Sequence, residues 1–301
     1  IWVRLSGGEG IMQNLIKNIR AYMNMNQSEF SKRLDVSFAT VNRWENGHAT
    51  PGRQAQEKLY ALCGEQKVPM DNMIFAKIRK MAEGLQIAPD RQILYHGSKS
   101  GISGHIAPKS RRQCDFGKGF YMGTDPAQAL TLICDYEYAK FYIVSIDVKQ
   151  LAVLNIPADL EWAMVVAYHR GRMEKIKGTP FYKRYQQMMS GKDLIIGNIA
   201  NDRMFFVIDN FFVGNITDAA LVGSLSALEL GEQYVAVSQK ACDAVRIEQE
   251  VPISHLEKLF LKKIAEDNRK KGAALANDIC KTYRREGLYF DEILEKAGDR
   301  S

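Results

Sequence analysis

The sequence predicts an α+β protein in which a small all-α module precedes a domain with a split sheet and a helical carboxy-terminal tail. Three observations predict it. Apolar residues recur every three or four positions from Met12 to about residue 66, which is the period of amphipathic helices. From Ile93 to about residue 254, short runs of β-branched and aromatic residues alternate with helical patterns, as in a sheet with inserted helices. Beyond residue 254 the pattern is helical again, with a mixed-charge outer face.

These patterns divide the 301 residues into five segments. The first eleven residues lack clear periodicity and are interpreted as an extension or a tag remnant. The other segments are a helical module over 12–66, a linker helix over 67–92, the sheet domain over 93–254 and the helical tail over 255–301.

Composition and charge exclude several classes of protein. The chain is 46% hydrophobic and 25% charged, which argues against wholesale disorder, and its net charge of +6 permits a nucleic-acid partner without requiring one. Five scattered cysteines with no CxxC pair argue against a disulfide framework and a zinc site. There is no apolar run long enough to cross a bilayer. We therefore expect a cytoplasmic protein with no metal site and no membrane contact.

The amino-terminal module has the pattern of two short helices joined by a tight turn. Asn26 can cap the first with Glu29 at the capping-box position, Ser37 can cap the second, and Gly47 can end it. The second helix would carry Asn and Arg side chains outward, and these pair bidentately with adenine and guanine edges in the major groove. The candidate DNA-binding residues are Gln27, Ser37, Thr40, Asn42, Arg43 and Asn46.

This stretch, NQSEFSKRLDVSFATVNRWENGHATP, closely resembles the Cro/C1-type repressor helix-turn-helix family. Ser31 stands where that family usually has alanine, and serine is small enough to fit. The resemblance implies binding to double-stranded DNA, with a homodimer as the usual form on DNA. The alternative interpretation is a helical bundle used only for protein contacts.

A glycine-rich stretch, FGKGFYMGTDPAQA, follows a strand-like run, ILYHGS, and a long loop. Its GxGxxxG spacing and its place after that loop disfavour a Rossmann dinucleotide site. Thr124 or Asp125 can cap the helix that begins at Pro126. We expect glycines 117 and 119 to let the backbone approach a ligand, while an aromatic residue supplies a flat face.

Three motifs in order, YHGS, FGKGFYMG and a later strand opening GEQYVAVS, resemble ADP-ribosyltransferases of the diphtheria-toxin-like, His-Tyr-Glu type. The likeness is greatest to a bacterial branch found in toxin–antitoxin operons, which GNIANDR also fits, and it covers residues 93 to about 245. The resemblance implies NAD as the cofactor, a macromolecular acceptor of ADP-ribose, and an antitoxin as a further partner.

The resemblance also assigns site residues position by position. His96 and Gly97 would contact the ribose and carboxamide of NAD, and Tyr121 would stack on the nicotinamide. The third catalytic position, usually a glutamate, falls on Gln233 with Glu232 beside it, and only one of two neighbours in a strand can face the site. If Gln233 faces in, turnover is slow, altered or absent; if Glu232 does, the usual chemistry survives. The candidate cofactor-binding residues are Gly97, Ser98, Phe116, Gly117 and Gly119.

Further residues are weaker candidates. The basic side chains that could grip the NAD pyrophosphate are Arg111, Arg112 and Lys118, with a solvated loop as the alternative. The residues that could bind phosphate or simply form a turn are Asn201, Asp202 and Arg203. The aromatic residues expected in the core are Phe205, Phe206, Phe211 and Phe212.

Three hypotheses of function follow from these patterns. The leading prediction is a DNA-binding, toxin-type ADP-ribosyltransferase-like protein that transfers ADP-ribose from NAD to a macromolecule. The alternative is a transcription regulator whose second domain binds NAD or a related nucleotide without catalysis. A pure interaction protein is a third, weaker hypothesis.

Overall fold

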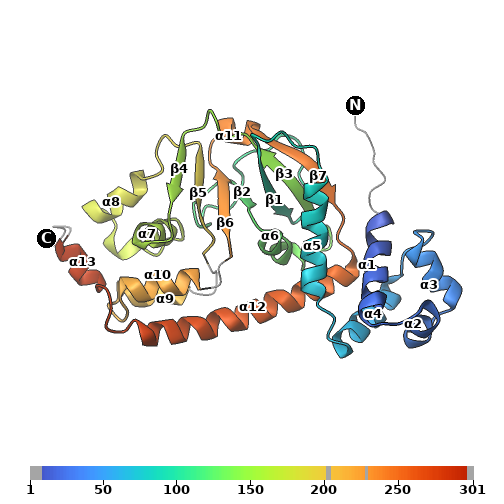
Figure 1. Cartoon of the computed structure of the whole chain (residues 1–301). Coiled ribbons are helices and arrows are strands. Elements are labelled where there is room, and N and C mark those ends of the chain that lie inside the picture. The colour runs from blue at the N-terminus through green and yellow to red at the C-terminus, as the bar shows by residue number, and fades with distance from the viewer. Residues whose placement is uncertain (1–8, 201–204, 228–229, 297–301) are drawn as a thin grey trace.

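The computed structural model describes residues 9–200, 205–227 and 230–296 of the chain. It has the α+β architecture that the sequence predicts. Figure 1 shows a cluster of helices at the amino-terminal end, a sheet in the middle, and the long helix α12 (His255–Thr282), which lies along the sheet domain with one end at the helical cluster. None of the helices in these residues is long and apolar enough to span a bilayer.

The amino-terminal module is built from short helices with strong local start signals. Asn26 and Glu29 form the expected capping box, and the Ser37 side chain accepts a hydrogen bond from the Thr40 backbone N–H. The helices are α1 (Glu9–Tyr22), α2 (Gln27–Leu34), α3 (Phe38–Glu45), α4 (Arg53–Glu65) and α5 (Met70–Glu83). Because α1 begins at Glu9, residues 9–11 are helical, although their sequence shows no clear period.

A buried acid ties the first three helices together. The Glu45 side chain is 1% exposed and accepts hydrogen bonds of 2.6 Å from Arg20 Nε in α1 and 2.6 Å from Gln27 Nε2 in α2. Burial acts to raise the pKa of Glu45, but the hydrogen bonds and the charge of Arg20 outweigh it. The pKa of Glu45 therefore lies below its ordinary value.

Glu45→Gln is expected to lower the free energy of unfolding at neutral pH by about 3 kcal/mol, because Arg20 loses its counter-ion in a largely buried place. Since the pKa of Glu45 is lower in the folded chain than in the unfolded chain, the ion pair stabilises fully above the unfolded value. That contribution is lost as the pH falls through the folded value. Urea titrations should therefore show the gap between wild type and variant closing in acid. A gap that does not change with pH would contradict this role.

The middle of the chain forms a mixed sheet of seven strands. They are β1 (Gln92–Ser98), β2 (Phe120–Gly123), β3 (Lys140–Ile146), β4 (Val153–Ile156), β5 (Leu194–Asn198), β6 (Glu232–Ala236) and β7 (Val245–Val251). Their order is β4-β5-β6-β2-β1-β3-β7, with β4 and β5 parallel and the other neighbours antiparallel. β1 pairs with β3 along its whole length but with β2 at one position, Tyr95 with Gly123. The sheet therefore opens into two halves between β1 and β2, as the expected split sheet does.

Helices flank the sheet, and one buried cluster spans its two halves, since it contains Leu94 of β1 and Met122 of β2. The remaining helices are α6 (Pro126–Ile133), α7 (Leu160–His169), a 3-10 turn η1 (Glu174–Ile176), α8 (Pro180–Gln187), α9 (Phe205–Phe212), α10 (Asp218–Ser226), α11 (Gln239–Asp243) and α13 (Phe290–Lys296). Asp125, not Thr124, caps α6. Phe211 is buried as expected, whereas Phe206 is 45% exposed, so the prediction of a core position for Phe206 is wrong.

The amino-terminal helices and the sheet domain share one hydrophobic core. Ile74 and Ile78 of α5 belong to the same buried cluster as residues of α6, β1, β3 and α12. Lys77 Nζ forms an ion pair of 2.5 Å with the buried Glu257 of α12, and the Leu256 backbone N–H donates to Gln56 Oε1 at 2.7 Å. The segment expected as a linker helix is therefore part of the core, and it holds the two parts together.

Candidate functional site

A cleft lies where the two halves of the sheet separate. Its volume is about 660 Å³, within the range of small-molecule sites in proteins. β1, β2, β6 and α6 line it, together with the loop that precedes β2. His96, Tyr121 and Gln233 all contribute to the lining, although they are far apart in the sequence. The structure thus brings together the three side chains that the motif order singles out.

His96 bridges the two halves of the sheet. Its Nδ1 lies 2.7 Å from the Tyr121 carbonyl oxygen, and because a carbonyl only accepts, Nδ1 carries the hydrogen and Nε2 is left as an acceptor. The imidazole stacks on Phe120, with ring centroids 4.2 Å apart. Burial lowers the pKa of His96 and outweighs the opposing effect of the backbone hydrogen bond. The ring is therefore neutral at neutral pH.

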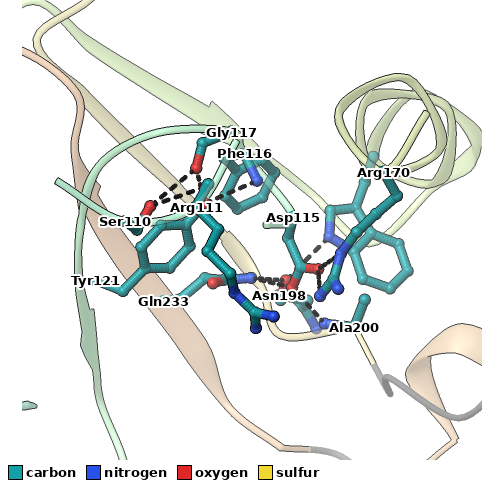
Figure 2. Close-up of polar contacts among 11 residues, drawn as sticks. Ser110, Arg111, Asp115, Phe116, Gly117, Tyr121, Arg170, Asn198, Ala200 and Gln233 are labelled. Carbon is teal, nitrogen blue, oxygen red and sulfur yellow. Dashed lines mark hydrogen bonds and ion pairs between the residues drawn. The ribbon is translucent and has the colours of Figure 1, made fainter. Parts of the chain in front are cut away.

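The Tyr121 ring is fixed through its hydroxyl group. The hydroxyl donates to the Gly117 carbonyl at 2.8 Å and accepts from the Phe116 backbone N–H at 3.1 Å, as Figure 2 shows. Ser110 ties the same loop together, because its Oγ accepts from the Gly119 N–H at 3.0 Å. Burial raises the pKa of Tyr121, so the phenol stays protonated and keeps its role as a donor.

The glycines beside Tyr121 are explained by packing within the protein. Gly117 has φ +71°, and a Cβ there would lie 2.7 Å from His169 Nδ1; a Cβ on Gly119 would lie 2.3 Å from Val235 Cγ1. Phe116 is 1% exposed and packs in the core. Gly119 lines the cleft, but Phe116 and Gly117 do not, which corrects their expected place on the cofactor.

Gly97 and Ser98 line the cleft as expected, but Gly97 also has a packing role. A Cβ at this position would lie 2.5 Å from the Ala129 carbonyl oxygen and 2.9 Å from Ile133 Cγ2, so β1 and α6 approach each other closely here. The missing side chain lets α6 form one wall of the cleft.

Gly97→Ala is expected to lower the free energy of unfolding by about 1–3 kcal/mol, because the new methyl group forces α6 away from β1. Gly64→Ala is the matched control. It lies in α4 with nothing within 4 Å of its Cβ position, and we expect no loss of stability there. Urea unfolding measures both variants, and equal stabilities would contradict this account of Gly97.

The structure distinguishes the two candidates for the third catalytic position. Gln233 is 6% exposed, lines the cleft, and donates from Nε2 to Asp115 Oδ2 at 2.8 Å and to the Asn198 carbonyl at 3.0 Å. Glu232 is exposed and does not line the cleft. Of the two candidates, Gln233 is therefore the one at the cleft, and its amide carries no formal charge.

Asp115 and Arg170 are residues of the cleft that the sequence analysis missed. Asp115 is 5% exposed and accepts two hydrogen bonds from Arg170, from Nε at 3.0 Å and from Nη2 at 2.7 Å. It also accepts from the Ala200 backbone N–H at 3.3 Å. The one available signal was that Asp115 directly precedes the glycine-rich stretch, since its partners are 55 to 118 residues away.

Cationic side chains outnumber acidic ones around the cleft. Within the described residues, the charged lining consists of Lys99, Lys109, Arg111, Arg170 and Asp115. Arg112 and Lys118, which were also considered for the pyrophosphate, do not line the cleft, while Asn201, Asp202 and Arg203 lie outside the described residues. This excess of positive charge suits an anionic ligand. In the same part of the chain, no group of His, Cys, Asp or Glu is arranged to hold a metal ion.

The second candidate surface is the outer face of α3. Arg43 and Asn46 are exposed, and Thr40 and Asn42 are half-buried. Asn46 Nδ2 donates to Asn42 Oδ1 at 3.1 Å, and Asn42 Nδ2 donates to Gln27 Oε1 at 3.4 Å. The polar side chains therefore form a connected row beside the exposed guanidinium of Arg43.

Two further features of this surface concern the start of α3. Ser37 Oγ accepts from the Thr40 N–H at 3.1 Å, so Ser37 serves as the helix cap. Phe38 is 53% exposed, and the sequence analysis did not single it out. An apolar side chain at the start of a recognition helix can contact the methyl group of thymine.

Comparisons with known proteins agree with this division of the chain. A family model described as helix-turn-helix matches residues 16–61. A model described as "Protein of unknown function (DUF3990)" matches residues 92–247, slightly more than half of the chain. No curated protein and no solved structure matches it. The chain therefore belongs to the DUF3990 family and carries a DNA-binding helix-turn-helix before its family domain.

Proposed function

We propose that this protein is a DNA-binding ADP-ribosyltransferase-like protein that takes NAD into the cleft and transfers ADP-ribose to a macromolecule. The observation that supports the proposal most is the meeting of His96, Tyr121 and Gln233 in one cleft between the two halves of the sheet. These are the positions that the motif resemblance assigns to catalysis, and nothing in their sequence spacing required them to converge.

The chemistry of the cleft suits the parts of an NAD molecule. The fixed Tyr121 ring offers a flat face to nicotinamide. The unprotonated Nε2 of His96 can accept a hydrogen bond from a ribose hydroxyl. Lys99, Lys109 and Arg111 provide positive charge for the pyrophosphate.

In the proposed reaction the bond between ribose C1′ and the nicotinamide nitrogen breaks, and its electron pair neutralises the ring nitrogen. A nucleophilic atom of the acceptor forms a new bond to C1′ and loses its proton to solvent. The residues of the cleft hold the two reacting parts in place and exclude water from one face. The Gln233 oxygen would lie beside the positive charge that develops on the ribose.

One observation favours a second function, a transcription regulator that senses NAD or a related nucleotide without turnover. The amide of Gln233 supplies no formal negative charge to the cleft. In either function the helix-turn-helix would bind operator DNA as a homodimer. An antitoxin would be a further partner only if the protein is the toxin-type enzyme.

Incubation of the purified chain with cell extract and NAD labelled in its adenylate half tests the proposal. We expect release of nicotinamide and transfer of label to a macromolecule. Saturable NAD binding without either product would support the regulator instead. Absence of NAD binding would contradict the transferase, and absence of binding by NAD and by related nucleotides would contradict both functions.

A further inference from the structure

Asp115 is the one acid among the described residues that line the cleft. Its two carboxylate oxygens have different partners. Oδ1 accepts both hydrogen bonds from Arg170, and Oδ2 accepts from Gln233 Nε2 at 2.8 Å and from the Ala200 N–H at 3.3 Å. Because Arg170 balances the charge of the carboxylate, the main effect of Asp115 on its neighbours is to orient them.

These contacts fix which end of the Gln233 amide faces the cleft. Asp115 Oδ2 and the Asn198 carbonyl both only accept, so the atom beside them is Nε2, and both of its hydrogens are used. The oxygen Oε1 is then the polar atom that Gln233 can offer to a ligand. Figure 2 shows this oxygen pointing away from Asp115, on the side of Tyr121.

We propose that Asp115 is a positioning residue that acts through Gln233 and holds its amide oxygen ready to accept a hydrogen bond from a ribose hydroxyl. This inference rests on the proposed function. It assigns to a pair of residues, an acid in the loop before β2 and an amide at the start of β6, the task of the single carboxylate that the resembling enzymes have at this strand.

The hydrogen bond between Gln233 and Asp115 predicts a specific effect of Asp115→Asn. Arg170 requires an acceptor, so the oxygen of the substituted side chain stays on the Arg170 side and its new NH₂ group faces Gln233. Two donors then oppose each other, and the Gln233 amide loses the contact with Asp115 that orients it. It either stays in place without that acceptor or turns its NH₂ group toward the cleft, which sets Oε1 against the Asn198 carbonyl. We expect kcat for nicotinamide release to fall about tenfold to a hundredfold, while the Kd for NAD changes by less than about threefold.

Three other variants complete the experiment. Asp209→Asn makes the same chemical change at an Asp–Arg pair outside the cleft, between Asp209 and Arg172, and we expect neither constant to change. The double variant Asp115→Asn with Gln233→Glu exchanges acid and amide, so that the amide in the loop donates to the new carboxylate on β6 and an oxygen again faces the ribose. We expect its kcat to recover to within a few-fold of wild type and to exceed that of Gln233→Glu alone, in which two carboxylates face each other. If Asp115 were merely structural, the carboxylate at position 233 would change kcat equally with Asp or Asn at position 115.

The outcomes separate this inference from the proposed function. If the wild type releases nicotinamide and Asp115→Asn has the same kcat, the inference is overturned but the proposed transferase function stands. If Asp115→Asn does not fold, the double variant decides, because it keeps one carboxylate in the cleft near Arg170; a folded double variant without turnover would overturn the inference. A wild-type chain that releases no nicotinamide would overturn both.

Discussion

Replacement of His96 by alanine is expected to reduce nicotinamide release at least about a hundredfold. The variant removes the Nε2 acceptor from the cleft and the Nδ1–H that binds the Tyr121 carbonyl across the gap between β1 and β2. Turnover should be followed at saturating NAD, with far-UV circular dichroism to check that the variant is folded.

The pH dependence of the wild type gives an independent check on His96. Because burial keeps its pKa below the ordinary value of 6.5, Nε2 stays an acceptor as the pH falls through 6.5, and activity should be lost at a lower pH. His105→Ala is the control, since this histidine is exposed and does not line the cleft. Equal turnover in wild type and His96→Ala would refute the proposed role of His96.

Arg43→Ala is expected to weaken specific DNA binding about tenfold to a hundredfold, because the exposed guanidinium of α3 can form two hydrogen bonds to a guanine edge. The operator should be selected from a random duplex library and binding measured by gel shift at fixed salt. Arg246→Ala removes one exposed positive charge from β7, far along the chain, and should change affinity much less.

The pattern of loss in Arg43→Ala distinguishes a base contact from a phosphate contact. A loss confined to sites with a particular base would show that Arg43 reads sequence, whereas an equal loss on all duplexes would indicate a phosphate contact. Binding that is unaffected by Arg43→Ala would contradict the placement of α3 in the major groove.

Most of the fold that could be predicted from the sequence was predicted from residues a few positions apart. The capping box of Asn26 and Glu29 and the cap at Ser37 depend on residues three positions apart, so the helix starts were found correctly. The sequence does not predict the strand β2, because four residues next to two glycines show no alternation. Its pairing with β6, more than a hundred residues away, is what makes it a strand.

Long-range contacts explain what the sequence could not show of the cleft. His96 and Tyr121 were found because each lies in a short motif. Asp115 was missed, because its role in the cleft depends on a hydrogen bond to Gln233, which lies 118 positions later in the sequence. The glycines were assigned to a ligand, but His169 and Val235, from distant elements, occupy the space that their side chains would need.

The central claim is that the gap between β1 and β2 is a site for NAD. A crystal structure of the chain with bound NAD tests it most directly. We predict the nicotinamide ring stacked on Tyr121 and a ribose hydroxyl within hydrogen-bonding distance of His96 Nε2. NAD bound anywhere else, or a cleft that stays empty at saturating NAD, would contradict the claim.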